Sequence, residues 1–183
     1  MTMTSTYTLT LGPLTRQLPI IPISADLAIA SFVLLGDAEL TDYAASALAH
    51  KMPAHFDYLI TMESKGIPLA QELSRLTNRA QFVVLRKSQK DYMRDPLSVP
   101  VNAITTSAPQ HLFLDGLDAQ SIAHKRVVIV DDVISSGGSL RAANELVQQA
   151  GATVVGQVAI LAEGDAAKRT DIEFLAELPL FPL

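Results

Sequence analysis

The stretch Val127–Leu140, VVIVDDVISSGGSL, carries the strongest structural signal in the sequence. Four branched apolar residues run into the adjacent acids Asp131 and Asp132, and then into a turn built from serine and glycine. A strand this apolar has both faces covered, as in a parallel sheet with helices on either side. Because ligands of such sheets bind beyond the carboxyl ends of the strands, the acids and the turn are expected to lie at a binding site.

The turn itself has the composition of an anion-binding site. Its glycines let the backbone approach a ligand, its N–H groups are closely spaced, and the helix that follows adds the positive end of its dipole. The acids cannot ligate the same anion, but they suit the vicinal hydroxyls of a sugar, or a divalent cation held through water. The turn residues are Ser135, Ser136, Gly137, Gly138 and Ser139.

Three other interpretations apply to this motif taken alone. A nucleoside-triphosphate P-loop needs a Gly-Lys-Ser/Thr ending, and the turn contains no lysine. A phospho-acceptor receiver domain places its acids early in a domain of roughly 120 residues, whereas this pair lies near the carboxyl terminus. An acidic turn that only caps a helix is the remaining alternative.

The flanking sequence predicts a doubly wound α/β domain. Buried strands are expected at 57–62, 81–86 and 153–161, around helices at 66–77 and 137–151, and such β-α-β units build parallel sheets. A further helix is expected at 38–52, and further strands at 6–11 and 27–36. The polar segment 87–100 contains two prolines and is expected to be a long loop, followed by a hairpin of 101–107 and 109–116.

Composition limits the class of protein. A chain of 183 residues with 49% hydrophobic residues suits a single domain over 1–183, with a core at about 37–165 and additions at 1–36 and 166–183. The net charge of −5 and the scattered basic residues argue against a nucleic-acid partner. Cysteine is absent, which excludes disulfides and thiolate metal sites. The longest apolar run is too short to span a membrane and no signal peptide is evident, so a cytoplasmic protein is expected.

Three segments together resemble the type I phosphoribosyltransferases, closest to those that act on adenine or xanthine. Along the chain they are YLITMESKGIPLAQELS at 58–74, FVVLRKSQKDYM at 82–93, and VVIVDDVISSGGS at 127–139. This is also their order in the family. The resemblance covers about residues 55–160. It implies a mostly parallel, Rossmann-like sheet with a small N-terminal hood, and the transfer of a phosphoribosyl group in purine salvage.

The resemblance also implies roles for individual residues. Asp131 and Asp132 would bind the ribose hydroxyls of phosphoribosyl pyrophosphate, and Ser135–Ser139 its 5-phosphate. Mg²⁺ would bridge pyrophosphate and ribose oxygens without direct protein ligands, contacted at most through Asp131 or Asp132. The implied pyrophosphate site consists of Glu63, Ser64, Lys65 and Gly66, with Arg86, Lys87 and Lys90 neutralising the leaving group. As structural alternatives, Glu63 would only cap a helix, and Lys87, Lys90 and Arg94 would belong to an ordinary solvated loop.

The base is the point at which the sequence departs from the family. Adenine phosphoribosyltransferases carry an acid beside an aromatic residue after the mobile loop, and the corresponding NAITTSAPQHL at 102–112 has neither. Length and order of elements favour adenine, with xanthine or another 6-oxopurine left open. The alternative function is a non-catalytic regulator that binds phosphoribosyl pyrophosphate or a nucleotide. The apolar N-terminal segments and IEFLAELPLFPL at 172–183 predict a homodimer.

Overall fold

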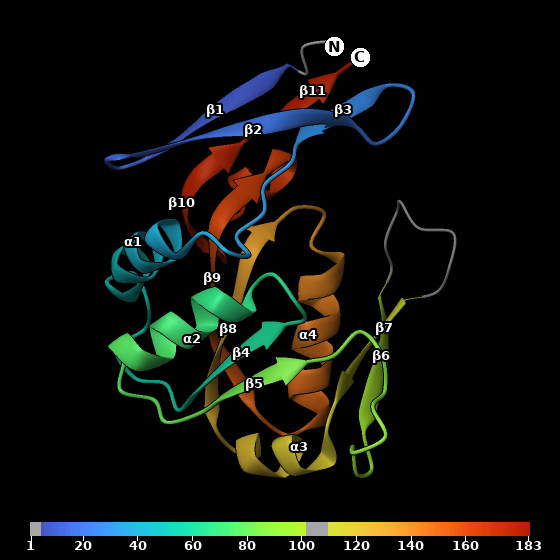
Figure 1. The fold of residues 1–183 in the computed structure, drawn as a ribbon. Coiled ribbons are helices and arrows are strands. Elements are labelled where there is room, and N and C mark those ends of the chain that lie inside the picture. The colour runs from blue at the N-terminus through green and yellow to red at the C-terminus, as the bar shows by residue number, and fades with distance from the viewer. Residues whose placement is uncertain (1–4, 102–109) are drawn as a thin grey trace.

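A five-stranded parallel sheet forms the centre of the molecule. The computed structural model describes residues 5–101 and 110–183 (Figure 1). The strand order is β10-β9-β8-β4-β5, and all neighbouring pairs are parallel. The predicted class, α/β with a mostly parallel sheet, is confirmed. The strands are β4 (Tyr58–Met62), β5 (Phe82–Leu85), β8 (Arg126–Ile134), β9 (Thr153–Glu163) and β10 (Glu173–Leu178).

Helices cover both faces of this sheet, as the apolar strands require. Helices α1 (Ala38–Ala49) and α2 (Ile67–Leu76) lie together on one face. Helix α4 (Gly138–Gln149) packs on the other, beside the short helix α3 (Gly116–Ile122) and the hairpin of β6 (Leu97–Val101) and β7 (Gln110–Leu114). The predicted apolar face of α4 is buried, because Leu140, Ala143 and Val147 are each at most 3% exposed.

A second sheet, the hood, lies across the carboxyl-terminal side of the central sheet (Figure 1). Its strands, in the order β1-β2-β3-β11, are β1 (Thr6–Leu11), β2 (Leu14–Pro22), β3 (Leu27–Ala30) and β11 (Leu180–Pro182). All of its pairings are antiparallel, and β11 brings the end of the chain back to pair with β3. Leu9 and Leu18 of the hood share one buried cluster with Leu40 of α1, so the hood is packed onto the core.

The structure departs from the predicted elements in two places, and a third prediction lies mostly outside the described residues. The predicted strand at 27–36 ends at Ala30, because the chain then leaves the hood and crosses to α1, with Val33 and Leu35 exposed. The predicted loop at 87–100 is too long, since β6 already begins at Leu97. Most of the predicted first hairpin strand, at 101–107, and the turn before Gln110 lie outside the described residues.

No element was predicted for β2 or α3. Strand β2 contains Pro19, which has no N–H to donate, but its carbonyl accepts a hydrogen bond from the Ser31 N–H at 2.8 Å. Helix α3 is short and begins at an Asp115 cap that accepts from the Leu117 N–H at 2.8 Å. Among the helices of the described residues, none is long and apolar enough to cross a bilayer.

Candidate active site

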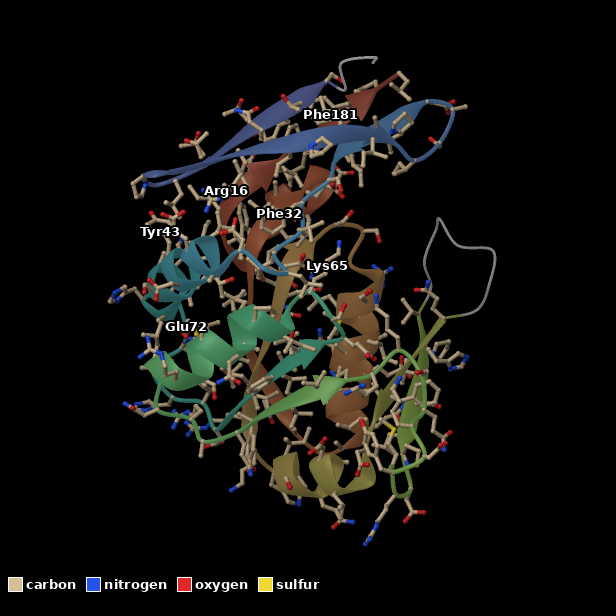
Figure 2. The ribbon with its side chains drawn as sticks, viewed as in Figure 1. Arg16, Phe32, Tyr43, Lys65, Glu72 and Phe181 are labelled. Carbon is tan, nitrogen blue, oxygen red and sulfur yellow. The ribbon has the colours of Figure 1, made fainter. Side chains whose placement is uncertain are left out.

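A cavity of about 320 Å³ lies between the carboxyl ends of the parallel strands and the hood. Figure 2 shows Phe32 and Lys65 in the space between these two sheets. One wall is polar and the other is apolar. The polar residues are Glu63, Ser64, Lys65, Lys87, Asp131, Asp132, Ser135, Ser139 and Glu163, and the apolar wall is built mainly from Ile29, Ala30, Phe32, Val133 and Leu178.

The serine- and glycine-rich turn forms a smaller hollow of about 110 Å³ beside the main cavity. All five residues of Ser135–Ser139 line it, and α4 begins at its end. Gly137 is the N-cap of α4 and has φ +76°, a conformation that glycine adopts without strain. The first-turn N–H groups of a helix have no intrahelical acceptor, so the hollow is suited to an anion.

Two arginine side chains stand behind this turn. A Cβ atom at Gly137 would lie 2.7 Å from Arg169 Nη1 and 3.8 Å from Arg141 Nη1. Arg169 is held in place by Asp171, whose carboxylate accepts from Arg169 Nε at 2.9 Å and Nη2 at 2.6 Å. Asp171 also accepts from Gln157 Nε2 of β9 at 3.2 Å. This Arg169–Asp171–Gln157 network therefore joins Arg169 to the central sheet and holds its positive charge beside the turn.

The two acids sit side by side on β8, within the strand rather than after it. Asp132 is 5% exposed, and its Oδ2 atom has no hydrogen-bond partner within the described residues. Asp131 accepts the Asp132 backbone N–H at 3.0 Å. Burial and the neighbouring Asp132 raise the pKa of Asp131 well above its usual range. Burial also raises the pKa of Asp132, although the Lys65 ammonium opposes this shift.

The loop between β4 and α2 forms the adjoining part of the polar wall. Ser64 and Lys65 are exposed to the cavity, and the Glu63–Ser64 peptide bond is cis. Gly66 is buried, and a Cβ atom there would lie 3.1 Å from Asp131 Oδ1 and would collide with Thr61 Oγ1. A side chain at position 66 is therefore excluded, and its absence lets the loop pack directly against Asp131.

Glu63 pairs with the start of the next loop instead of capping α2. Its Oε2 atom accepts from Arg86 Nε at 3.2 Å and from the Lys87 backbone N–H at 3.1 Å. The Lys87 hydrogen bond is the main cause that lowers the pKa of Glu63, and Arg86 adds to it. Arg86 is engaged by this pair and does not line the cavity, whereas the Lys87 side chain does. Lys90 does not line it either, because its Nζ atom donates to Ser88 Oγ at 2.6 Å.

A sequence model of the phosphoribosyl transferase domain matches residues 36–176 of this chain, which include every residue of the polar wall. The chain belongs to the phosphoribosyl transferase domain family. The predicted resemblance to type I phosphoribosyltransferases is confirmed, and with it the predicted enzyme class at the level of the family.

Individual relatives and solved structures agree with this membership. A hypoxanthine/guanine phosphoribosyltransferase of Methanococcus voltae is 33% identical over 77% of this chain and 71% of its own length. HGPRTase-like protein 3 of Haloterrigena turkmenica is 38% identical over 60% of this chain, and the match spans about half, 55%, of that relative. The structure of an adenine phosphoribosyltransferase from Thermoanaerobacter pseudethanolicus is similar in fold, with a TM-score of 0.72 and 22% identity over 87% of this chain and 95% of the other.

Three residues at or beside the candidate site were not predicted from the sequence: Phe32, Glu163 and Arg169. Glu163 had a detectable signal, because it is the first charged residue after a predicted strand and the carboxyl ends of parallel strands meet at one edge. Phe32 and Arg169 had none, since both reach the site from segments outside the predicted motif. The family's base-side acid was sought at 102–112, and residues 102–109 of that segment lie outside the described residues.

The resemblance to the family implies a Mg²⁺ ion, and the described residues show which side chains could bind it. They contain no group of three or more carboxylate or imidazole side chains able to enclose a metal ion. The unpartnered Oδ2 atom of Asp132 and the adjacent Asp131 carboxylate are oxygen donors of the kind that Mg²⁺ accepts, directly or through water. The donor set fits a Mg²⁺ ion that brings most of its ligands with a phosphorylated substrate.

Proposed function

We propose that this chain transfers the phosphoribosyl group of phosphoribosyl pyrophosphate to a purine base, forming a nucleoside monophosphate and pyrophosphate. One observation carries the proposal. A single cavity joins the acid pair of β8, the anion-binding turn before α4, and the lysine-bearing loop before α2, in a chain of the phosphoribosyl transferase domain family. These three features match the three parts of the substrate: ribose, 5-phosphate and pyrophosphate.

The turn and the acid pair would hold the ribose phosphate. The 5-phosphate binds against the first-turn N–H groups of α4, and Ser135 and Ser139 donate their hydroxyl groups. Asp131 and Asp132 accept hydrogen bonds from the ribose hydroxyls, which fixes the ring. Because the reacting carbon becomes positively charged as its bond to pyrophosphate breaks, two nearby carboxylates stabilise the transition state more than the ground state.

The opposite side of the polar wall would receive the leaving group. Lys65 and Lys87 line the cavity next to the acids, and their ammonium groups neutralise charge that grows on the departing pyrophosphate. When bound with the substrate, Mg²⁺ supplies further charge neutralisation at the pyrophosphate oxygens. Lys90 and Arg86 act indirectly: Arg86 orients Glu63, and Lys90 belongs to the loop at 87–96 that would close over the cavity and exclude water.

The purine would lie against the apolar wall, to which the hood contributes Ile29 and Ala30. Phe32 of the segment after β3 and Leu178 of β10 would contact its faces. A 6-oxopurine is the class of base that the relatives favour, since the relative with 33% identity over most of this chain is named a hypoxanthine/guanine phosphoribosyltransferase. Structures named adenine phosphoribosyltransferases are below 25% identity to this chain and support the fold alone. The preference for adenine stays a prediction.

The quickest test measures pyrophosphate release. Purified protein is incubated with Mg²⁺, phosphoribosyl pyrophosphate and one of adenine, hypoxanthine, guanine, xanthine, uracil or orotate. We expect release with at least one purine and none with uracil or orotate. Binding of phosphoribosyl pyrophosphate by calorimetry without release for any base would contradict the proposal and favour the regulator. A cytoplasmic location also stays a prediction.

A further inference from the structure

A further cavity lies at the amino ends of the parallel strands, opposite the candidate active site. Its volume is about 540 Å³, and it is bounded by the first residues of β4 and β5, the second half of α2, and α3. It shares no lining residue with the candidate active-site cavity, so the proposed phosphoribosyl transfer gives it no role. Its polar lining includes Gln71, Ser74, Arg75, Arg79, Asp118 and Ser121.

Arg79 is held at this cavity by its backbone and by its side chain. Its backbone N–H donates to the Ser74 carbonyl at 2.8 Å, and its own carbonyl accepts from Ser74 Oγ at 2.7 Å. The guanidinium lies over the ring of Phe56, with Cζ 4.6 Å from the ring centre. Because these contacts already order the residue, a ligand that binds it loses less conformational entropy.

The positive charge of Arg79 has no compensating partner. Its Nε atom is buried without an acceptor, and no ion pair or side-chain hydrogen bond of its guanidinium is present within residues 5–101 and 110–183. Arg75, by contrast, donates from Nε to Glu72 Oε1 at 2.9 Å. A half-buried guanidinium without a carboxylate is unfavourable, and the oxygens of a phosphate group match its planar set of donors. The cavity is therefore suited to a ligand that carries a phosphate.

Asp118 limits the class of that ligand. It is half-buried in the first turn of α3, lines the same cavity, and makes no hydrogen bond or ion pair in the part of the chain that the structure describes. Burial and the neighbouring Asp115 raise the pKa of Asp118. A carboxylate repels a polyanion such as pyrophosphate, but it accepts hydrogen bonds from hydroxyl and amino groups. A ligand with a single phosphate and several such donors would compensate both Arg79 and Asp118.

We propose that this cavity binds a phosphate monoester of a sugar or nucleoside, with the phosphate at Arg79 and the hydroxyl or amino groups at Asp118. The volume of about 540 Å³ is sufficient for a ligand of this size. The proposal is independent of the transferase function, because the two cavities lie at opposite ends of the strands and have no residue in common.

The test follows the Nε–H resonance of Arg79 in ¹⁵N-labelled protein, which is assigned by its loss in R79K. The probes are ribose 5-phosphate and adenosine monophosphate at millimolar concentration, with sodium chloride at matched ionic strength. We expect a saturable shift with at least one phosphate monoester and none with chloride. A shift with ribose 5-phosphate shows that the sugar phosphate is sufficient, and a shift with adenosine monophosphate alone shows that the base is needed. No shift with either monoester, or an equal shift with chloride, would overturn the proposal.

Two further variants separate this cavity from the candidate active site, which would bind the same probes. In Gly137→Val the Arg79 shift should persist with an unchanged midpoint, and its loss would mean that the signal comes from the active site. In Arg79→Gln the affinity, read from the backbone N–H of Gln81, should fall about tenfold or more.

Arg126→Gln is the matched control, because Arg126 is exposed and lines neither cavity. Its affinity for the monoesters should equal that of wild type, and equal losses in Arg79→Gln and Arg126→Gln would contradict a specific site at Arg79. None of these titrations depends on turnover, so a failure of the transferase function would leave their outcome unchanged.

Discussion

At the scale of single residues, the buried acids Asp131 and Asp132 are expected to lower the stability of the folded protein when no ligand is bound. Asp132 is almost fully buried and lacks a hydrogen-bond partner for Oδ2 within the described residues. Asp131 beside it has a strongly raised pKa. Both carboxylates are unfavourable in the absence of ligand and become favourable when sugar hydroxyls donate to them. Strain of this kind is expected where binding, rather than folding, determines the residue.

We predict that Asp132→Asn stabilises the protein and abolishes substrate binding. The folded state holds a proton on Asp132 more tightly than the unfolded chain, so wild-type stability falls as pH rises above the ordinary pKa of 3.8 through the raised one. Asparagine removes this loss, and the variant should gain about 1 kcal/mol at pH 7. Urea unfolding at pH 3.5 and pH 7 measures the difference, which should shrink at the lower pH. Unchanged affinity for phosphoribosyl pyrophosphate would contradict the assignment.

Gly137→Val is expected to disable the phosphate-binding turn. The backbone there has φ +76°, and the new Cβ atom would meet Arg169 Nη1 at 2.7 Å. Affinity for phosphoribosyl pyrophosphate should fall at least tenfold, with a loss of about 1 to 3 kcal/mol in stability. Gly151→Val is the control, because Gly151 also has positive φ, at +74°, but has no atom within 4 Å of its would-be Cβ and lies at the far end of α4. If both variants bind equally well, the turn does not hold the phosphate.

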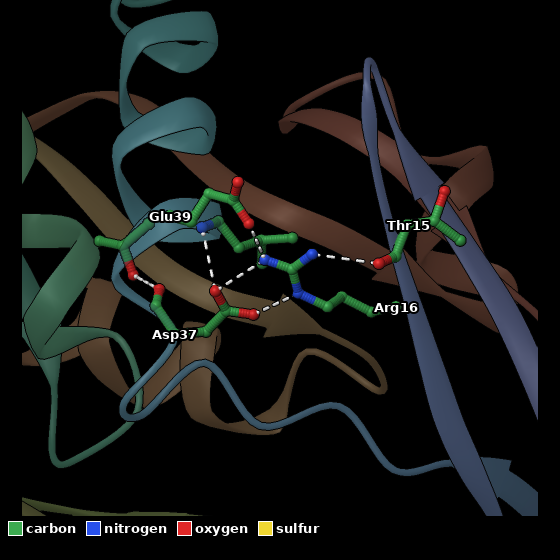
Figure 3. A network of polar contacts seen from close by, with 6 residues as sticks. Thr15, Arg16, Asp37 and Glu39 are labelled. Carbon is green, nitrogen blue, oxygen red and sulfur yellow. Dashed lines mark hydrogen bonds and ion pairs between the residues drawn. The ribbon is translucent and has the colours of Figure 1, made fainter.

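At the scale of elements, one ion-pair network joins the hood to the core. Arg16 of β2 donates to Asp37 through Nε at 2.6 Å and Nη2 at 3.0 Å, and to Glu39 at 2.8 Å (Figure 3). Asp37 is also the N-cap of α1 and accepts from the Leu40 N–H at 3.1 Å. One carboxylate therefore both stabilises the start of α1 and links it to strand β2 of the hood.

Asp37→Ala should lower the free energy of unfolding by about 2 kcal/mol, because it removes the helix cap and leaves Arg16 without its main partner. The Arg16 guanidinium is the main cause that lowers the pKa of Asp37, so this contribution is present at neutral pH and is lost as pH falls below 3.8. Denaturant unfolding at pH 7 and pH 3 measures both effects. Glu39→Ala is the control: its side chain is 69% exposed, and its loss should cost under about 0.5 kcal/mol. Equal losses in the two variants would show that Asp37 has no special role.

Some of the helices and strands could be predicted from the sequence, and others could not. Strands β4, β5, β8 and β9 and helices α1, α2 and α4 were predicted because apolar periodicity is a local property of the chain. Strand β2 was not, since Pro19 argues against a strand and its pairing with β1 is long-range. The acid pair and the turn were found from adjacent residues, whereas Arg169 reaches the turn only through tertiary packing.

At the scale of the whole molecule, we propose that the chain folds as one unit and pairs as a homodimer. The hood shares its buried cluster with α1, so it should unfold together with the core in a single calorimetric transition. Exposed apolar side chains on the hood and the segment after it offer a surface for a second copy: Ile21, Ile23, Val33, Leu35 and Leu183. Light scattering at micromolar concentration should give twice the 19.7 kDa chain mass. A monomeric mass would contradict the pairing.

The most direct test of the central claim is a crystal structure of the protein with Mg²⁺ and phosphoribosyl pyrophosphate. The account predicts the 5-phosphate against Ser135–Ser139, the ribose hydroxyls on Asp131 and Asp132, and the pyrophosphate beside Lys65. Density for the sugar phosphate in another part of the molecule, or a ribose that does not contact the acid pair, would contradict it.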